Sequence, residues 1–206
     1  TGSGDDSIDI STTASASTFS NSWGWGWGSN YSYQNVQSIG LANSTINTGS
    51  GDDAIDISST ASASTFNNSW NWWGGWNDIS NVNVEAVGLF NSTINTGSGD
   101  DVININSLAT NENISFGILN PGDANVSSYG AYGSSINSGS GDDSININAS
   151  SVSLTRNLWG WESREIGLGQ SEAVGLEKST INTGSGDDKV AISAYSFGTI
   201  TNSWAI

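Results

Sequence analysis

The sequence contains no cysteine, no histidine and no methionine, and its one proline is Pro121. The first two absences exclude disulfide bonds and any chemistry that depends on a thiol or an imidazole. A serine nucleophile would also lack the histidine that usually acts as its base. We therefore expect no enzyme activity in this chain.

Basic residues are scarce as well, since only 4 Lys and Arg residues stand against 20 Asp and Glu residues among 206, a formal net charge of −16. Proteins that hold nucleic acids by their phosphates need Lys and Arg, so the composition excludes that class of partner. The acidic balance favours cation binding instead. No apolar run is long enough to span a bilayer, so we expect no membrane insertion.

One six-residue motif, Thr-Gly-Ser-Gly-Asp-Asp, recurs five times and organises the whole chain. Its copies begin at Thr1, Thr48, Thr96, Ser138 (with serine in first place) and Thr183. Repetition at a near-constant period indicates units that bury their strands against one another. We predict a single solenoid segment with four complete repeats, 1–47, 48–95, 96–137 and 138–182, followed by a partial repeat, 183–206.

Alternation of apolar and polar residues within each repeat predicts strands. Aliphatic pairs such as Ile55 and Ile57 follow each motif, and a second alternating stretch comes next, with Ala61 and Ala63 on one face. Alanines also occupy the equivalent positions of the first repeat. Because alanine is small, we predict that two sheets approach each other closely there. Larger residues occupy this stretch in the later repeats, namely Leu108, Val152 and Leu154.

The remainder of each repeat is a loop and a returning strand that ends in Ser-Thr-Ile-Asn or Ser-Ser-Ile-Asn. No segment has a helical period, and Ser, Thr, Asn and Gly are poor helix residues. We predict an all-β parallel β-solenoid with one repeat of about 45 residues per coil, rather than two coils per repeat. Equivalent residues would then stack, in an isoleucine ladder (Ile46, Ile94, Ile136, Ile181) beside an asparagine ladder (Asn47, Asn95, Asn137, Asn182).

Stacking also brings the acidic pairs together, and ten of the 20 acidic residues belong to the five Asp-Asp pairs. Carboxylates about 4–5 Å apart repel by roughly 3–4 kcal/mol at an effective dielectric constant near 20. Glycine permits turns that point backbone carbonyls inward, and carboxylate and carbonyl oxygens together suit a hard cation such as Ca²⁺. A purely hydrophilic turn is the alternative interpretation. The predicted Ca²⁺ site comprises Asp5, Asp6, Asp52, Asp53, Asp100, Asp101, Asp142, Asp143, Asp187 and Asp188 with Gly49, Gly51, Gly97, Gly99, Gly139, Gly141, Gly184 and Gly186.

The turn resembles the nonapeptide G-G-x-G-x-D-x-U-x of the RTX, or haemolysin-type, calcium-binding repeats of secreted bacterial proteins. Over 48–56, Gly49 and Gly51 match the second and fourth positions, Asp53 the sixth and Ile55 the inward aliphatic position. The resemblance implies that the second Asp of each pair is a side-chain ligand and the first a secondary or water-mediated partner. Here the first position is Thr or Ser and the motif is not tandem, which implies a related calcium turn on the edge of a larger coil.

Tryptophan is the second unusual feature, because most of the ten Trp residues lie in Trp/Gly-rich loops between strands. Three interpretations remain open. The rings could pack on one another and on Phe19 and Phe66, they could mediate self-association, or they could stack on a polysaccharide. The residues concerned are Trp23, Trp25, Trp27, Trp70, Trp72, Trp73, Trp76, Trp159 and Trp161.

These features lead to a functional hypothesis with two alternatives. We expect a calcium-stabilised structural repeat segment of an extracellular bacterial fibre, sheath or surface-layer protein, which self-associates into filaments. One alternative is an adhesin whose Trp loops bind glycans at the cell surface. The other is a non-catalytic calcium-binding module of a larger secreted enzyme.

Overall fold

The computed structural model describes residues 2–23, 31–70, 79–116, 123–157 and 169–202. Every regular element within these ranges is a β-strand, and every strand pair is parallel. The chain is an all-β parallel β-solenoid, as the sequence predicts. Parallel pairing places equivalent residues of successive repeats side by side, in strands about 4.7–4.9 Å apart.

Each coil contributes one strand to each of three sheets. The long sheet contains β2 (Ser7–Trp23), β5 (Ala54–Trp70), β8 (Val102–Phe116), β11 (Ser144–Asn157) and β14 (Lys189–Asn202). The returning sheet contains β3 (Tyr31–Ala42), β6 (Ile79–Phe90), β9 (Ala124–Tyr132) and β12 (Gln170–Glu177). The turn-side sheet contains β1 (Gly2–Ser3), β4 (Thr45–Ser50), β7 (Thr93–Ser98), β10 (Ser135–Ser140) and β13 (Thr180–Asn182).

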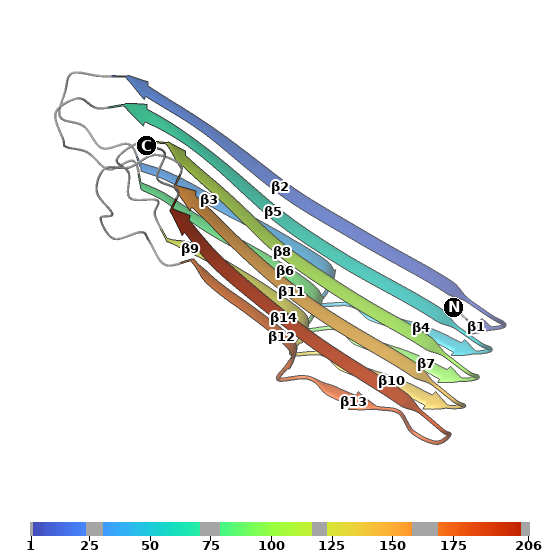
Figure 1. The fold of residues 1–206 in the computed structure, drawn as a ribbon. Coiled ribbons are helices and arrows are strands. Elements are labelled where there is room, and N and C mark those ends of the chain that lie inside the picture. The colour runs from blue at the N-terminus through green and yellow to red at the C-terminus, as the bar shows by residue number, and fades with distance from the viewer. Residues whose placement is uncertain (1, 24–30, 71–78, 117–122, 158–168, 203–206) are drawn as a thin grey trace.

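The coil is flattened into two layers (Figure 1). The long sheet forms one layer, and the returning and turn-side sheets follow each other in the second layer behind it. The corner between those two sheets is made by residues with positive φ, namely Asn43, Asn91, Gly133 and Lys178. Asn and Gly tolerate this left-handed conformation better than most residues, which explains why the returning strand ends at this point.

The registers show one repeat per coil, since Ile55 of β5 pairs with Ile103 of β8, 48 positions further along the chain. The predicted isoleucine ladder is present, with Ile46, Ile94, Ile136 and Ile181 aligned across the turn-side sheet. The asparagine ladder beside it is also present. Asn95 Nδ2 donates to Asn47 Oδ1 at 2.8 Å, and Asn182 Nδ2 donates to Asn137 Oδ1 at 2.8 Å.

The core between the layers is aliphatic near the acidic turns. Ile55, Ile57, Ile103 and Ile105 of the long sheet are fully buried against residues such as Ile94 of the turn-side sheet. A second cluster further along the long sheet contains the small residues Ala61, Ala63 and Ala109 packed with valines of the returning sheet. Small side chains at these positions therefore do allow the two layers to approach closely, as predicted.

The larger residues of this stretch do not replace the inward alanines. Leu108 pairs with Thr60 and Val152 pairs with Thr110, so both lie on the outer face of the long sheet. The inward position of the third repeat is taken by Ala109, which is buried. Counting alternate positions from Ile103 would have given this result, because successive side chains of a strand point to opposite faces. Leu154 shares the outward face with Val152, two positions before it.

Candidate metal centre

The acidic motif forms the connection from the turn-side sheet to the long sheet, and the five connections stack directly on one another. Backbone hydrogen bonds join neighbouring turns: Gly51 N–H donates to Ser98 O at 2.8 Å, and Gly99 N–H donates to Ser140 O at 2.9 Å. The alignment of the turns is therefore fixed by the backbone itself.

Glycine is required in this turn for two reasons. Gly49 and Gly97 have φ values of 110° and 106°, which L side chains rarely adopt. A Cβ atom on Gly97 would also come closer than 3.0 Å to the carbonyl oxygen of Gly49 in the preceding coil. The same holds for the equivalent glycines, Gly51, Gly99, Gly139, Gly141, Gly184 and Gly186.

The two aspartates of each pair occupy different environments. Asp53, Asp101 and Asp143, the second members of their pairs, are 1–2% exposed. Asp6 and Asp188 hold the same position in the outermost turns and are partly exposed. The first members, Asp5, Asp52, Asp100, Asp142 and Asp187, are all exposed to solvent. The structure thus separates the aspartates into an inner row and an outer row.

The inner row forms a hydrogen-bonded ladder. Asp53 N–H donates to Asp101 Oδ1 at 2.8 Å, and Asp101 N–H donates to Asp143 Oδ1 at 3.0 Å. The ladder continues outward on both sides, from Asp6 N–H to Asp53 Oδ1 at 2.9 Å and from Asp143 N–H to Asp188 Oδ1 at 3.1 Å. Four of the five inner carboxylates, all except that of Asp6, therefore satisfy a backbone donor of the preceding coil.

The outer row forms a second ladder of opposite direction. Asp100 N–H donates to Asp52 Oδ1 at 2.9 Å, and Asp142 N–H donates to Asp100 Oδ1 at 2.9 Å. Here the carboxylates of the first four turns accept from the following coil. The equivalent bonds of the remaining turns join Asp52 to Asp5 and Asp187 to Asp142.

The inner row carries uncompensated polar atoms. The second carboxylate oxygens, Oδ2 of Asp53, Asp101 and Asp143, are buried and have no hydrogen-bond partner. No salt bridge joins these three residues to a basic side chain in the described part of the chain. Burial raises the pKa of the Asp101 carboxyl above its ordinary value of 3.8, and the neighbouring Asp143 and Asp53 carboxylates raise it further. The Asp53 N–H and the nearby Thr96 hydroxyl offset part of this rise in the pKa of Asp101. The Thr96 hydroxyl donates its hydrogen bond to Ser138 O at 2.9 Å, so it leaves Asp101 Oδ2 without a partner.

The unpartnered Oδ2 atoms of the inner row suit a metal ion. Buried carboxylate oxygens without a proton donor are hard ligands that suit Ca²⁺, so the donor type fits. Within the described ranges, no group of three or more acidic side chains converges on one point. An ion at this position would be held by inner carboxylates of adjacent coils and would take its remaining ligands from turn carbonyls or water.

Most of the tryptophans predicted to form a binding or self-association surface lie outside the described residues, namely Trp25, Trp27, Trp72, Trp73, Trp76, Trp159 and Trp161. Trp23 and Trp70 end strands β2 and β5 and pair in register. The adjacent Phe19 and Phe66 rings stack with centroids 5.2 Å apart and planes 4° from parallel. The Phe19 side chain is nevertheless 69% exposed, so this stack forms a ridge on the outer face of the long sheet.

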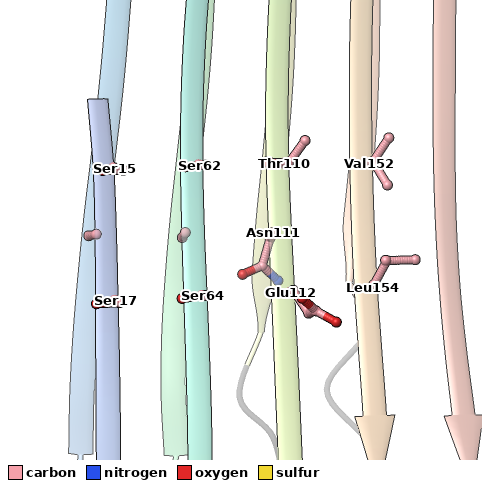
Figure 2. A pocket seen from close by; sticks show the side chains of 11 residues that line it. Ser15, Ser17, Ser62, Ser64, Thr110, Asn111, Glu112, Val152 and Leu154 are labelled. Carbon is pink, nitrogen blue, oxygen red and sulfur yellow. The ribbon is translucent and has the colours of Figure 1, made fainter. Parts of the chain in front are cut away.

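The outer face of the long sheet also contains an open hollow of about 550 Å³ (Figure 2). Side chains of β2, β5, β8 and β11 line it, with Ser15, Ser17, Ser62, Ser64, Thr110, Glu112, Val152 and Leu154 among them. Its surface is therefore rich in hydroxyl groups with one carboxylate, Glu112. Sequence analysis missed this hollow, although the run of serines on alternate positions of the first two repeats was a readable signal.

Comparison of the chain with protein-family models, curated proteins and solved structures finds no match. The resemblance of the acidic turn to RTX repeats therefore stays a prediction. The described residues form no helix that is long and apolar enough to cross a membrane.

Proposed function

We propose that this chain is a calcium-stabilised structural repeat segment of an extracellular bacterial fibre, sheath or surface-layer protein. The observation that carries the proposal is the inner aspartate row, in which each of three adjacent coils buries a carboxylate oxygen without a partner. A bound Ca²⁺ would supply positive charge to the inner row.

The chain's own residues would bind such an ion between coils. Asp53 and Asp101 belong to adjacent coils and are linked through a backbone hydrogen bond to Oδ1, which leaves Oδ2 of each for a cation. The outer aspartates remain in contact with solvent and would act through water. Because the ligands come from different coils, ion binding and coil stacking favour each other.

This coupling gives a reason for an extracellular location. Where free calcium is low, the inner carboxylates repel one another and oppose folding. Extracellular calcium modules commonly bind with dissociation constants of about 10⁻⁴–10⁻³ M, so the chain would fold after export. The resemblance to RTX proteins implies the same sequence of events.

The repeat geometry supports a structural role. Each coil offers the next one the same ladder of isoleucines, asparagines and aspartates, so a longer chain lengthens the solenoid without a new fold. In the described chain β2 and β14 are the edge strands of the long sheet. Unpaired backbone donors and acceptors on such strands can pair with a further coil, whether it belongs to the same chain or to another copy.

Electron microscopy of the protein in calcium and in chelator tests this role. We expect filaments in calcium, with strands repeating every ~4.8 Å along the axis, and no filaments in chelator. Folded single particles in calcium would contradict the filament role while leaving calcium binding intact. Filaments that are equally abundant in chelator would contradict the calcium requirement instead.

The hollow on the long sheet supports one alternative, a glycan-binding adhesin. Serine hydroxyls and the Glu112 carboxylate can hydrogen-bond to sugar hydroxyls, and the exposed Phe19–Phe66 stack adds an apolar ridge on the same face. A glycan array with the folded protein tests this alternative. Binding that is lost in Glu112→Gln would support it, and an array without binding would reject it.

A further inference from the structure

The inner face of the long sheet changes character along its length. Near the acidic turns it is aliphatic, with Ile103 and Ile105 fully buried. Further along β8, the inward positions are taken by Asn111, Asn113 and Ser115, which are 2%, 1% and 0% exposed. A strip of buried polar side chains therefore continues the core toward the end of the coil opposite the acidic turns.

This polar strip holds most of the unpartnered polar atoms of the described chain. Eleven buried side-chain atoms have no hydrogen-bond partner, and eight of them lie outside the aspartate row. Those eight are both amide atoms of Asn111 and of Asn113, the hydroxyls of Ser115, Ser153 and Thr65, and Oε1 of Gln34. Buried polar groups in folded proteins almost always have a partner in protein or in ordered water.

The register shows that the eight atoms belong to one region. Ser153 lies beside Asn111 in the neighbouring strand β11, and Thr65 lies beside Asn113 in β5. Thr65 in turn lies beside Thr18, whose hydroxyl accepts a hydrogen bond from Gln34 Nε2 of the facing sheet. The strip thus spans neighbouring coils and both layers.

Neighbouring coils do not satisfy the two asparagines. On the outer face, Asn146 Nδ2 donates to Asn104 Oδ1 at 3.0 Å, because like residues stack. Asn111, by contrast, lies between Ala63 and Ser153, which are both shorter than it. The apolar cluster next to the strip, which includes Val82 and Ala124 of the returning sheet, offers no side-chain hydrogen bond either.

We propose that the polar strip is an internal hydration site, in which ordered water molecules bind between the two layers. Asn111 has shorter neighbours in both adjacent coils, and the eight atoms supply both donors and acceptors. A buried water typically makes about three hydrogen bonds, so eight unpartnered atoms correspond to about three waters. The coil then has a dry aliphatic half next to the acidic turns and a hydrated half at the other end.

Water ¹⁷O magnetic relaxation dispersion tests this proposal, because it detects water molecules that stay inside a protein longer than the protein tumbles. Each test variant takes the residue found at the equivalent position of the adjacent coil: Asn111→Ala matches Ala63, and Asn113→Thr matches Thr65. We expect each variant to lose the signal of at least one internal water. Asn106→Ala, on the exposed outer face of the same strand, is the matched control and should lose none.

Water bound elsewhere contributes equally to the relaxation dispersion of the wild type and of every variant. The difference between the wild type and a variant therefore measures the water of the polar strip. Equal signals in the wild type, Asn111→Ala and Asn113→Thr would overturn the proposal. Urea unfolding gives a second, independent readout. A dry strip predicts a higher midpoint for Asn111→Ala, because an unpartnered amide is removed, whereas a hydrated strip predicts an unchanged or lower midpoint.

Discussion

The backbone N–H of Asp53 donates a hydrogen bond to Oδ1 of Asp101, 2.8 Å away in the next coil. This bond satisfies a backbone donor at a corner of the coil. It also fixes a carboxylate that is 1% exposed and whose other oxygen, Oδ2, has no partner. The same ladder that holds the corners in register therefore also concentrates negative charge inside the protein.

Replacing Asp101 by Asn should change stability in opposite directions with and without calcium. Asn keeps an acceptor oxygen for the Asp53 N–H but removes the buried charge. In calcium-depleted buffer we expect the free energy of unfolding to rise by on the order of 1–3 kcal/mol, so that the variant keeps more β-structure than the wild type. In millimolar calcium we expect it to fall relative to wild type, with the loss of bound calcium in calorimetry.

Asp100→Asn is the matched control, since Asp100 belongs to the same turn and also accepts a backbone hydrogen bond, from Asp142. Asp100 is exposed, so its replacement should change the free energy of unfolding by less than about 0.5 kcal/mol in either buffer. Equal changes in the free energy of unfolding for Asp100→Asn and Asp101→Asn would contradict the distinction between the inner and outer rows.

The stability of calcium-depleted protein should depend on pH through Asp101. Burial, with the Asp143 and Asp53 carboxylates, raises the pKa of Asp101 in the folded state above 3.8. The folded state therefore binds this proton more tightly than the unfolded state, and its stability increases as pH falls through the raised pKa toward 3.8. In calcium-depleted buffer, lowering the pH from 7 should therefore return the β-structure of the wild type, followed by circular dichroism, toward that of Asp101→Asn; a difference between the two proteins that is constant over this range would refute the assignment.

Gly88→Ala should destabilise the fold, because β6 packs directly against Ile105 of the long sheet at this glycine. An added Cβ would come closer than 3.0 Å to Ile105 Cγ2 and to the carbonyl oxygen of Gly130. We expect a loss of about 1–3 kcal/mol in the free energy of unfolding, as for other overpacked cores. Gly198→Ala is the control, because its nearest neighbour is 3.6 Å away, and urea unfolding compares the two. Equal midpoints for both variants would mean that the layers are further apart than described.

The sequence was sufficient to predict the architecture because equivalent residues recur at the same offsets. Ile46 and Ile94, or Asn47 and Asn95, could be matched by position alone, and parallel stacking then follows. The returning-strand glycines, Gly40, Gly88, Gly130 and Gly175, recur equally regularly, and a glycine inside a strand is a known sign of close backbone approach. That signal was available and was not used.

Other features could not be predicted from the pattern. Both aspartates of a pair have the same side chain, so only the turn geometry decides that Asp53 faces inward and Asp52 faces solvent. The opposite directions of the two carboxylate ladders depend on that geometry as well. The burial of Asn111 and Asn113 could not be predicted for a different reason: asparagine is a residue type that mostly lies on the surface.

Circular dichroism during calcium removal tests the central claim most directly, because it follows β-structure while the ion is withdrawn by EGTA and then restored. We predict that β-structure is lost in excess EGTA and returns at calcium concentrations of about 10⁻⁴–10⁻³ M, with magnesium much less effective. An unchanged β-sheet spectrum in excess EGTA would contradict the account, because the inner carboxylates would then be tolerated without a cation.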